Sequence, residues 1–109
     1  MANTFKLKTK ANVGISTQNV YVVPSATTTV VIGITLANTS GSGVNVGVGI
    51  TRAGATEDVK LLKNAPIPQG SSLEFMAGNK VVLEETDTVT VDSDTNNSID
   101  ASLTIMEIT

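Results

Sequence analysis

The stretch Val30-Val31-Ile32-Gly33-Ile34-Thr35-Leu36-Ala37 (residues 30–37) decides the fold class. Alternate residues of a strand point to opposite faces, and both faces of this run are largely apolar, which predicts a central, buried strand. On this pattern one face carries Val30, Ile32, Ile34 and Leu36. After a turn-like segment at 38–43, residues 44–51 alternate strictly between apolar and small or polar side chains, which predicts a half-buried strand. Gly47 and Gly49 lie on its bare face, which indicates either a tight subunit contact or a β-bulge, and we favour a bulge or simple tolerance of glycine.

Short apolar runs bounded by turn residues continue through the rest of the chain. They lie at residues 20–23, 59–61, 73–75, 81–83, 89–91 and 99–105, and a turn is predicted at 66–70. Val and Ile together contribute 22 residues and Thr another 16, and such β-branched side chains favour strands over helices. We therefore predict an all-β fold, an antiparallel β-sandwich of about seven to nine short strands, Ig-like or jelly-roll-like.

The length and composition fit one small globular domain. The chain has 109 residues, 40% of them hydrophobic and 16% charged, which is too apolar for a disordered tail and too interrupted for a membrane span. We expect residues 13–109 to form a single β-sandwich domain and residues 1–12 an extended N-terminal arm or edge strand. The sequence holds no Cys and opens without an apolar leader segment, so we expect synthesis in a cytoplasm.

Charge is distributed unevenly along the chain. Every acidic residue lies at or after Glu57, whereas the preceding residues carry only basic charges. The basic segment near the N-terminus alternates with apolar residues, and its candidate partner-binding residues are Phe5, Lys6, Leu7, Lys8 and Lys10. Two interpretations stay open: an edge strand whose lysines prevent aggregation, or an arm that adds to a neighbouring subunit with an acid-rich second half.

The residue types that most enzymes need are scarce. Without His or Cys the chain lacks the commonest general base, the commonest metal ligand and the thiol nucleophile. The densest carboxylate set, Glu84, Glu85 and Asp87, falls in a predicted turn rather than across a cleft. We expect a protein that is not an enzyme and that uses no cofactor.

One segment partly matches a calcium-binding loop. Its candidate ligands are Asp92, Asp94, Asn96 and Asp100. Asn97 stands where such a loop needs glycine, and Leu103 stands where it needs a bidentate glutamate. We therefore interpret the segment as an Asp/Asn-rich hairpin turn and predict no metal site.

Aromatic side chains are rare, since Phe5, Tyr21 and Phe75 are the only ones and Trp is absent. Stacking surfaces for bases or sugars cannot be built from so few rings. The net charge of −3 also disfavours a phosphate backbone, so we expect no nucleic-acid partner. A host-surface or carbohydrate-binding module remains an alternative of a different class.

Residues 20–24 and 28–38 resemble a pattern shared by small structural proteins of tailed bacteriophages. Residues 59–73 and 80–84 continue that resemblance, which covers roughly residues 20–109. The sequence departs from the pattern at Thr86-Asp87, where Gly-Asp would be expected.

The resemblance implies a β-sandwich component of a virion, made in the host cytoplasm and usually oligomeric. The role that it favours is capsid decoration or cementing, with the major capsid protein and other virion proteins as partners. A neck, tail or baseplate component is the alternative. No membrane partner is expected.

Overall fold

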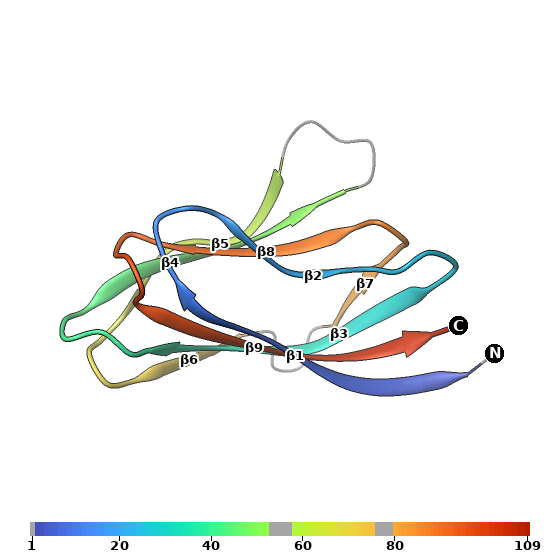
Figure 1. The fold of residues 1–109 in the computed structure, drawn as a ribbon, viewed down its shortest axis with the longest axis horizontal. Coiled ribbons are helices and arrows are strands. Elements are labelled where there is room, and N and C mark those ends of the chain that lie inside the picture. The colour runs from blue at the N-terminus through green and yellow to red at the C-terminus, as the bar shows by residue number, and fades with distance from the viewer. Residues whose placement is uncertain (1, 53–57, 76–79) are drawn as a thin grey trace.

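The computed structural model describes residues 2–52, 58–75 and 80–109. Within them the secondary structure is entirely β-strand. The strands are β1 (Asn3–Val13), β2 (Gln18–Val22), β3 (Thr28–Asn38), β4 (Val44–Thr51), β5 (Asp58–Ile67), β6 (Ser72–Phe75), β7 (Val81–Leu83), β8 (Thr88–Ser93) and β9 (Ile99–Ile108). They form two facing antiparallel sheets (Figure 1), so the predicted β-sandwich is confirmed.

The strand order selects the jelly roll from the two predicted architectures. The first sheet has the order β1-β9-β3-β6, with β7 also pairing β3, and the second has β2-β8-β4-β5. If β6 and β7 are counted as one interrupted strand, the first strand pairs with the last, the second with the next to last, and so on to β4 with β5. This pairing is that of a long hairpin rolled into two sheets, which is the jelly-roll plan.

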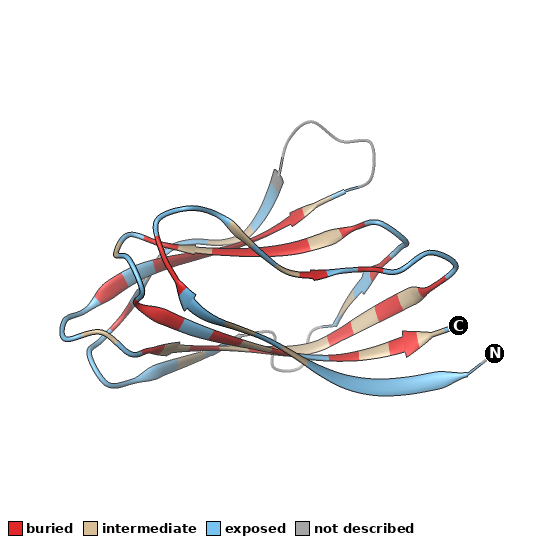
Figure 2. Cartoon of the chain, in the orientation of Figure 1, coloured by how far each residue is buried: buried red, intermediate tan, exposed pale blue. Residues whose placement is uncertain are grey.

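The core lies between the two sheets and follows the alternation of the strands. In β9 the odd-numbered residues from Ile99 to Glu107 are buried, and the even-numbered residues point to the outer face. Figure 2 shows this alternation along β3 and β9 of the first sheet, whereas β4 and β8 of the second sheet are buried over most of their length. The largest fully buried side chains are Leu36, Ile67, Leu83, Ile99, Leu103 and Ile105. Stability therefore rests on aliphatic packing between sheets.

The predicted faces of residues 30–37 are wrong in their first half. A register shift between Val31 and Gly33 reverses the inward face of β3, so Val31 is buried while Val30 points outward. After the shift Ile34 and Leu36 point into the core. A β-bulge adds one residue and moves each later side chain to the other face, and the apolar residues on both faces conceal this shift in the sequence.

Strand β5 also differs from the sequence prediction. The turn predicted at residues 66–70 begins later, because Pro66 and Ile67 belong to β5 and Ile67 is buried in the core. Proline is tolerated there because β5 is an edge strand, which leaves some backbone N–H positions without a ladder partner. Val59, predicted to be a strand residue, lies in β5 but is exposed.

The glycines of β4 lie close to side chains of the neighbouring strand β8. The strand has register shifts on either side of Val48, which agrees with the predicted bulge. A Cβ atom at Gly47 would lie 2.5 Å from Oδ1 of Asp92, and one at Gly49 would lie 3.1 Å from Oγ1 of Thr90. Side chains of the adjacent strand therefore fill the space above these glycines, so the outer face that looks bare in the sequence is covered.

Candidate interaction surface

The N-terminal segment forms the edge strand of the first sheet. Residues 3–10 of β1 pair in continuous register with β9, and a shift follows before Val13. The two ends of the chain lie together, since backbone hydrogen bonds join Ala2 to Thr109 (Figure 1). In this single chain the segment is an edge strand of its own sheet, which is the first of the two interpretations of the sequence.

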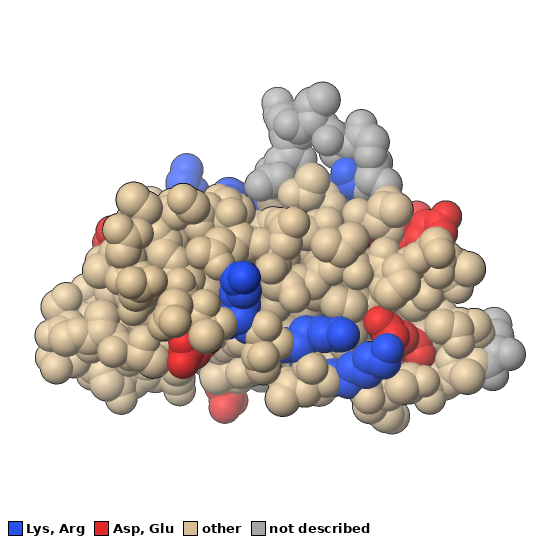
Figure 3. All heavy atoms as spheres, viewed as in Figure 1, with Lys and Arg blue, Asp and Glu red and all other residues tan. Residues whose placement is uncertain are grey.

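The predicted alternation of lysines and apolar residues orients β1. Lys6, Lys8 and Lys10 are opposite Ile105, Leu103 and Ala101, which are core residues of β9. Residues that are opposite across a ladder share a face of the sheet, so the lysines point toward the second sheet. Figure 3 shows basic side chains in a row along the edge where β1 lies. Inward-pointing charges at a sheet edge oppose the addition of further strands.

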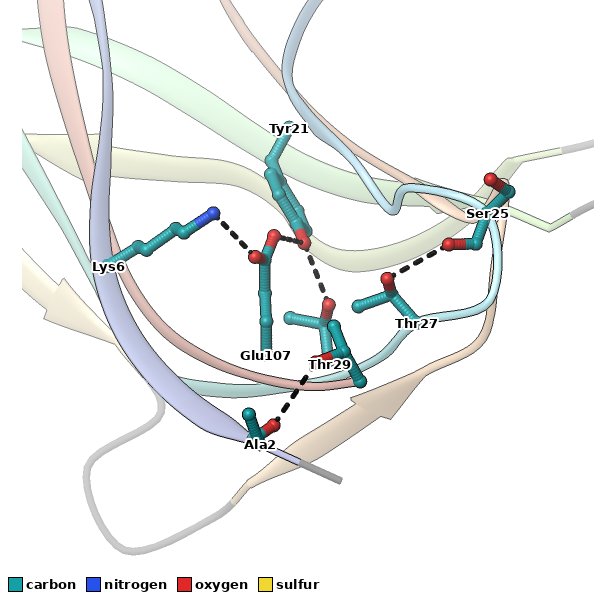
Figure 4. A network of polar contacts seen from close by, with 8 residues as sticks. Ala2, Lys6, Tyr21, Ser25, Thr27, Thr29 and Glu107 are labelled. Atoms are coloured by element: carbon teal, nitrogen blue, oxygen red, sulfur yellow. Dashed lines mark hydrogen bonds and ion pairs between the residues drawn. The ribbon is translucent and has the colours of Figure 1, made fainter.

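Lys6 is part of a polar network that joins the two sheets. Its Nζ lies 2.7 Å from Oε1 of Glu107, whose side chain is only 6% exposed. The hydroxyl of Tyr21, on β2, donates to Oε2 of Glu107 over 2.6 Å and lies 2.8 Å from Oγ1 of Thr29. Figure 4 shows Lys6 and Tyr21 reaching the carboxylate from opposite sheets. The carboxylate thus accepts from both a cation and a phenol, which offsets the cost of burying it.

The network shifts the pKa values of Glu107 and Tyr21 in opposite directions. The hydrogen bond from Lys6, followed by that from Tyr21, lowers the pKa of Glu107 although burial opposes this. Burial, followed by the hydrogen bond to Glu107, raises the pKa of Tyr21 to about 12. At neutral pH Glu107 is therefore ionised and Tyr21 keeps its proton as the donor. Nζ of Lys8 lies 6.0 Å from the centre of the Tyr21 ring, at the outer limit of a cation–π contact.

The outer face of the first sheet carries an apolar row across four strands. Phe5 of β1 is opposite Met106 of β9, which is opposite Val30 of β3, which is opposite Val82 of β7. A neighbouring row contains Leu7, Thr104 and Gly33. We call these seven residues the outer patch. Phe5, Leu7 and Val82 are 69%, 64% and 61% exposed, respectively. Several large apolar side chains therefore point to solvent on one face, where isolated ones would be usual.

The four residues of the candidate calcium loop hydrogen-bond to the chain itself. Oδ2 of Asp92 accepts from the Thr17 hydroxyl, and Oδ1 of Asp94 accepts from the backbone N–H of Asn45. The side-chain oxygens of Asn96 and Asp100 accept from the backbone N–H groups of Ile15 and Asn12, respectively. Within the described ranges no group of three or more His, Cys, Asp or Glu side chains is placed to hold a metal ion.

Two turn residues that stand where glycine would be expected, Thr86 and Asn97, have a positive φ. Asn97, which replaces the glycine of a calcium loop, has a φ of 52°, and Thr86, which replaces the glycine of the phage pattern, has a φ of 68°. Both turns therefore use the left-handed conformation that glycine would favour. Leu103 is 1% exposed in the core and is unavailable as a ligand.

Sequence analysis singled out Phe5 and Leu7 but did not identify the other residues of the outer patch or the buried carboxylate of Glu107. The signal was present for Glu107, since the core series Ile99, Leu103 and Ile105 continues to it with the same period. The partners of Phe5 across the sheet depend on strand order, which the sequence does not reveal. The described residues form no pocket, and none of their segments is a helix long and apolar enough to cross a membrane.

Comparisons with known proteins support the fold alone. No family model matches this chain, and no curated protein matches it. A solved structure of Bacillus endospore appendages, described as a novel family of disulfide-linked pili, is similar over 99% of this chain and 87% of its own length. Its TM-score is 0.60 and its sequence identity is 14%. The likeness agrees with the β-sandwich seen here.

Proposed function

We propose that this chain is a non-catalytic structural subunit that acts through protein–protein contacts made by the outer patch. The observation that supports the proposal most is the exposure of Phe5, Leu7 and Val82 on one sheet face. Contiguous exposed apolar surface of this kind favours association because water is released when the surface is covered. The lysines of β1 point to the other side of the sheet and do not interrupt the patch.

The setting that we propose is the virion of a tailed bacteriophage. The support for it is the resemblance of residues 20–109 to small phage structural proteins. In this setting the chain decorates the capsid and contacts the major capsid protein, and a position in the neck, tail or baseplate is the alternative. A decoration protein needs a folded domain and a contact surface rather than a catalytic cleft, which is consistent with the outer patch.

A second candidate function is a subunit of a filamentous appendage. It is favoured by the likeness in fold to the Bacillus endospore appendage protein. That family is described as disulfide-linked, whereas the 109 residues here contain no Cys. Copies of this sequence would therefore have to associate without disulfide bonds.

The proposal is tested by incorporation of variants into particles. Tagged copies of wild type, of a Phe5→Ser/Leu7→Ser variant and of a Val22→Ser variant are made in cells that assemble the particle or filament. Val22 is a matched control because it is an exposed apolar strand residue on the second sheet. We expect wild type and Val22→Ser to be recovered in purified particles and the double variant to be lost from them. Circular dichroism checks that each variant is folded.

Equal recovery of all three proteins would contradict a contact through the outer patch. Absence of the wild-type protein from every purified particle and filament would contradict the structural function itself. The kind of assembly that contains the protein separates the virion from the appendage.

A further inference from the structure

We propose that residues 2–10, which we call the arm, are exchanged between copies of this chain. The arm of one copy then pairs with β9 of another copy, in the register that the single chain shows. The partner is a second copy, and the surface that receives the arm is the edge of its β9. This inference goes beyond the proposed function, because it uses the ladder between β1 and β9 rather than the outer patch.

The arm is held in place without contributing apolar side chains to the core. All the buried apolar side chains that the structure describes lie at Val13 or beyond, and the arm itself is exposed except at Lys8 and Lys10, which are half-buried. The arm is held by its backbone ladder to β9 and by the ion pair between Lys6 and Glu107. Its release therefore removes no apolar side chain from the core, and a second copy restores every lost contact.

The residues between the arm and the rest of the chain have the features of a hinge. The register of the ladder shifts between Lys10 and Val13, and the two residues in between, Ala11 and Asn12, are exposed. Asn12 has a φ of 57°. Directly after them the backbone is anchored, because the carbonyl of Val13 accepts from the N–H of Ser98. A change at residues 11 and 12 to extended backbone therefore redirects the arm as a unit.

The charges favour β9 of a second copy as the receiving strand. The arm carries Lys6, Lys8 and Lys10 and no acidic residue. Strand β9 carries Asp100 and Glu107 and no basic residue. Opposite charges therefore attract the arm of one copy to β9 of another. The inward-pointing lysines oppose the addition of an extra strand, but exchange adds none, because the incoming arm replaces an identical one.

The length of the hinge determines how close the two copies lie. Two or three extended residues span roughly 7–10 Å, so the second copy lies directly beside residue 12 of the first. Phe5 and Leu7 move with the arm and arrive opposite Met106 and Thr104 of the second copy. The outer patch is therefore completed by the exchanged arm. Reciprocal exchange gives a closed dimer, and one-way exchange gives an open chain of copies.

A disulfide pair engineered into the full chain reads directly which copy the arm pairs with. The sequence has no Cys, and Thr9→Cys/Ser102→Cys places one thiol on the arm and one opposite it on β9. Ala2 and Thr109 exchange both backbone hydrogen bonds, and the ladder alternates from there. The pair at 9 and 102 is therefore a non-hydrogen-bonded one, with Cα atoms about 4.5 Å apart, which suits a disulfide.

The variant is oxidised mildly over a series of protein concentrations and analysed by non-reducing gel electrophoresis. We expect disulfide-linked dimers or larger species whose fraction rises with concentration. The matched control is Thr35→Cys/Ser102→Cys, which keeps position 102 but places its partner on β3. Because both of its thiols lie outside the arm, this control should give only monomers linked within one chain. Circular dichroism checks that both variants are folded.

The hinge and the ion pair are tested in chains without Cys by size-exclusion chromatography. Asn12→Val places a β-branched residue where the unexchanged form needs a positive φ, so it should raise the association constant about tenfold or more. Asn12→Gly accepts a positive φ and should not raise it. Lys6→Met removes an ion pair that both forms contain. It should therefore speed the approach to equilibrium about tenfold and leave the final dimer fraction unchanged.

Monomers linked only within one chain at every concentration, and also in purified particles, would overturn the inference. Linkage between copies in the control pair to the same extent, or an equal rise in association for Asn12→Val and Asn12→Gly, would also overturn it. If the arm is not exchanged but Phe5→Ser/Leu7→Ser still abolishes incorporation into particles, this inference fails and the proposed function stands. If exchange occurs but wild type is absent from every particle and filament, the proposed function fails alone.

Discussion

The single tyrosine of the sequence makes the polar network directly measurable. Tyr21 is the only tyrosine and the chain has no Trp, so tyrosinate absorbance in the ultraviolet reports this residue alone. We expect its pKa to be about 12 in the folded protein, against 10.0 for an ordinary tyrosine. The cause is burial between the sheets, with the hydrogen bond to Glu107 as the second contribution.

This shift has a calculable effect on stability. A difference of about two pKa units corresponds to about 2 to 3 kcal/mol, at 1.36 kcal/mol per unit. Because folding raises the pKa, the unfolded chain loses its proton first, and the contribution is complete below pH 10 and is lost between pH 10 and about 12. A total stability of the usual 5–15 kcal/mol would be reduced by a large fraction.

The assay is an alkaline titration followed by tyrosinate absorbance and circular dichroism together, repeated in urea to give the unfolded pKa. Glu107→Gln removes the carboxylate that disfavours tyrosinate, so the Tyr21 pKa should fall toward 10 but remain above it because burial persists. A midpoint near 10 in wild-type protein that is still folded by circular dichroism would refute the arrangement of Tyr21 and Glu107.

Three further predictions concern the turns and the glycines. Thr86→Gly should stabilise the fold by about 1 kcal/mol in urea denaturation, since Thr86 has a φ of 68° that costs a β-branched residue energy; an unchanged midpoint would argue against the strained turn. Gly47→Ala should destabilise it by about 1–3 kcal/mol because the new Cβ would lie 2.5 Å from Asp92 Oδ1. Gly41→Ala, which meets nothing within 4 Å, is its control and should be near neutral in the same thermal melts. EDTA should leave the melting temperature unchanged, because the oxygens of the candidate calcium loop hydrogen-bond to the chain; a rise of several degrees with added calcium would contradict this.

The sequence predicts the fold class well because the alternation of apolar residues is a local signal. The run at residues 99–105 places Ile99, Leu103 and Ile105 in the core without any knowledge of neighbours. The β3 bulge could not be predicted, since both faces of residues 30–37 are apolar and a one-residue shift leaves no trace. The strand order, and with it the choice between Ig-like and jelly-roll plans, depends on long-range pairing.

Only part of the outer patch could be predicted from the sequence, because its other residues are brought together by long-range strand pairing. The alternation at residues 5–10 separates Phe5 and Leu7 from the lysines, but it does not tell which set points inward. In the structure the lysines point toward the second sheet, and Lys6 forms an ion pair with the buried Glu107. Val30, Met106 and Val82 join the patch through pairing between strands that are distant in the sequence.

Counting the copies of this chain in purified particles by quantitative mass spectrometry tests whether it is a structural subunit. A structural role predicts a fixed ratio of this chain to the main protein of the assembly, in every preparation and after stringent washing. A ratio comparable to that of the major capsid protein is expected for capsid decoration, and a much lower fixed ratio for a neck, tail or baseplate position. A trace amount that varies between preparations and is removed by washing would rule out a structural role.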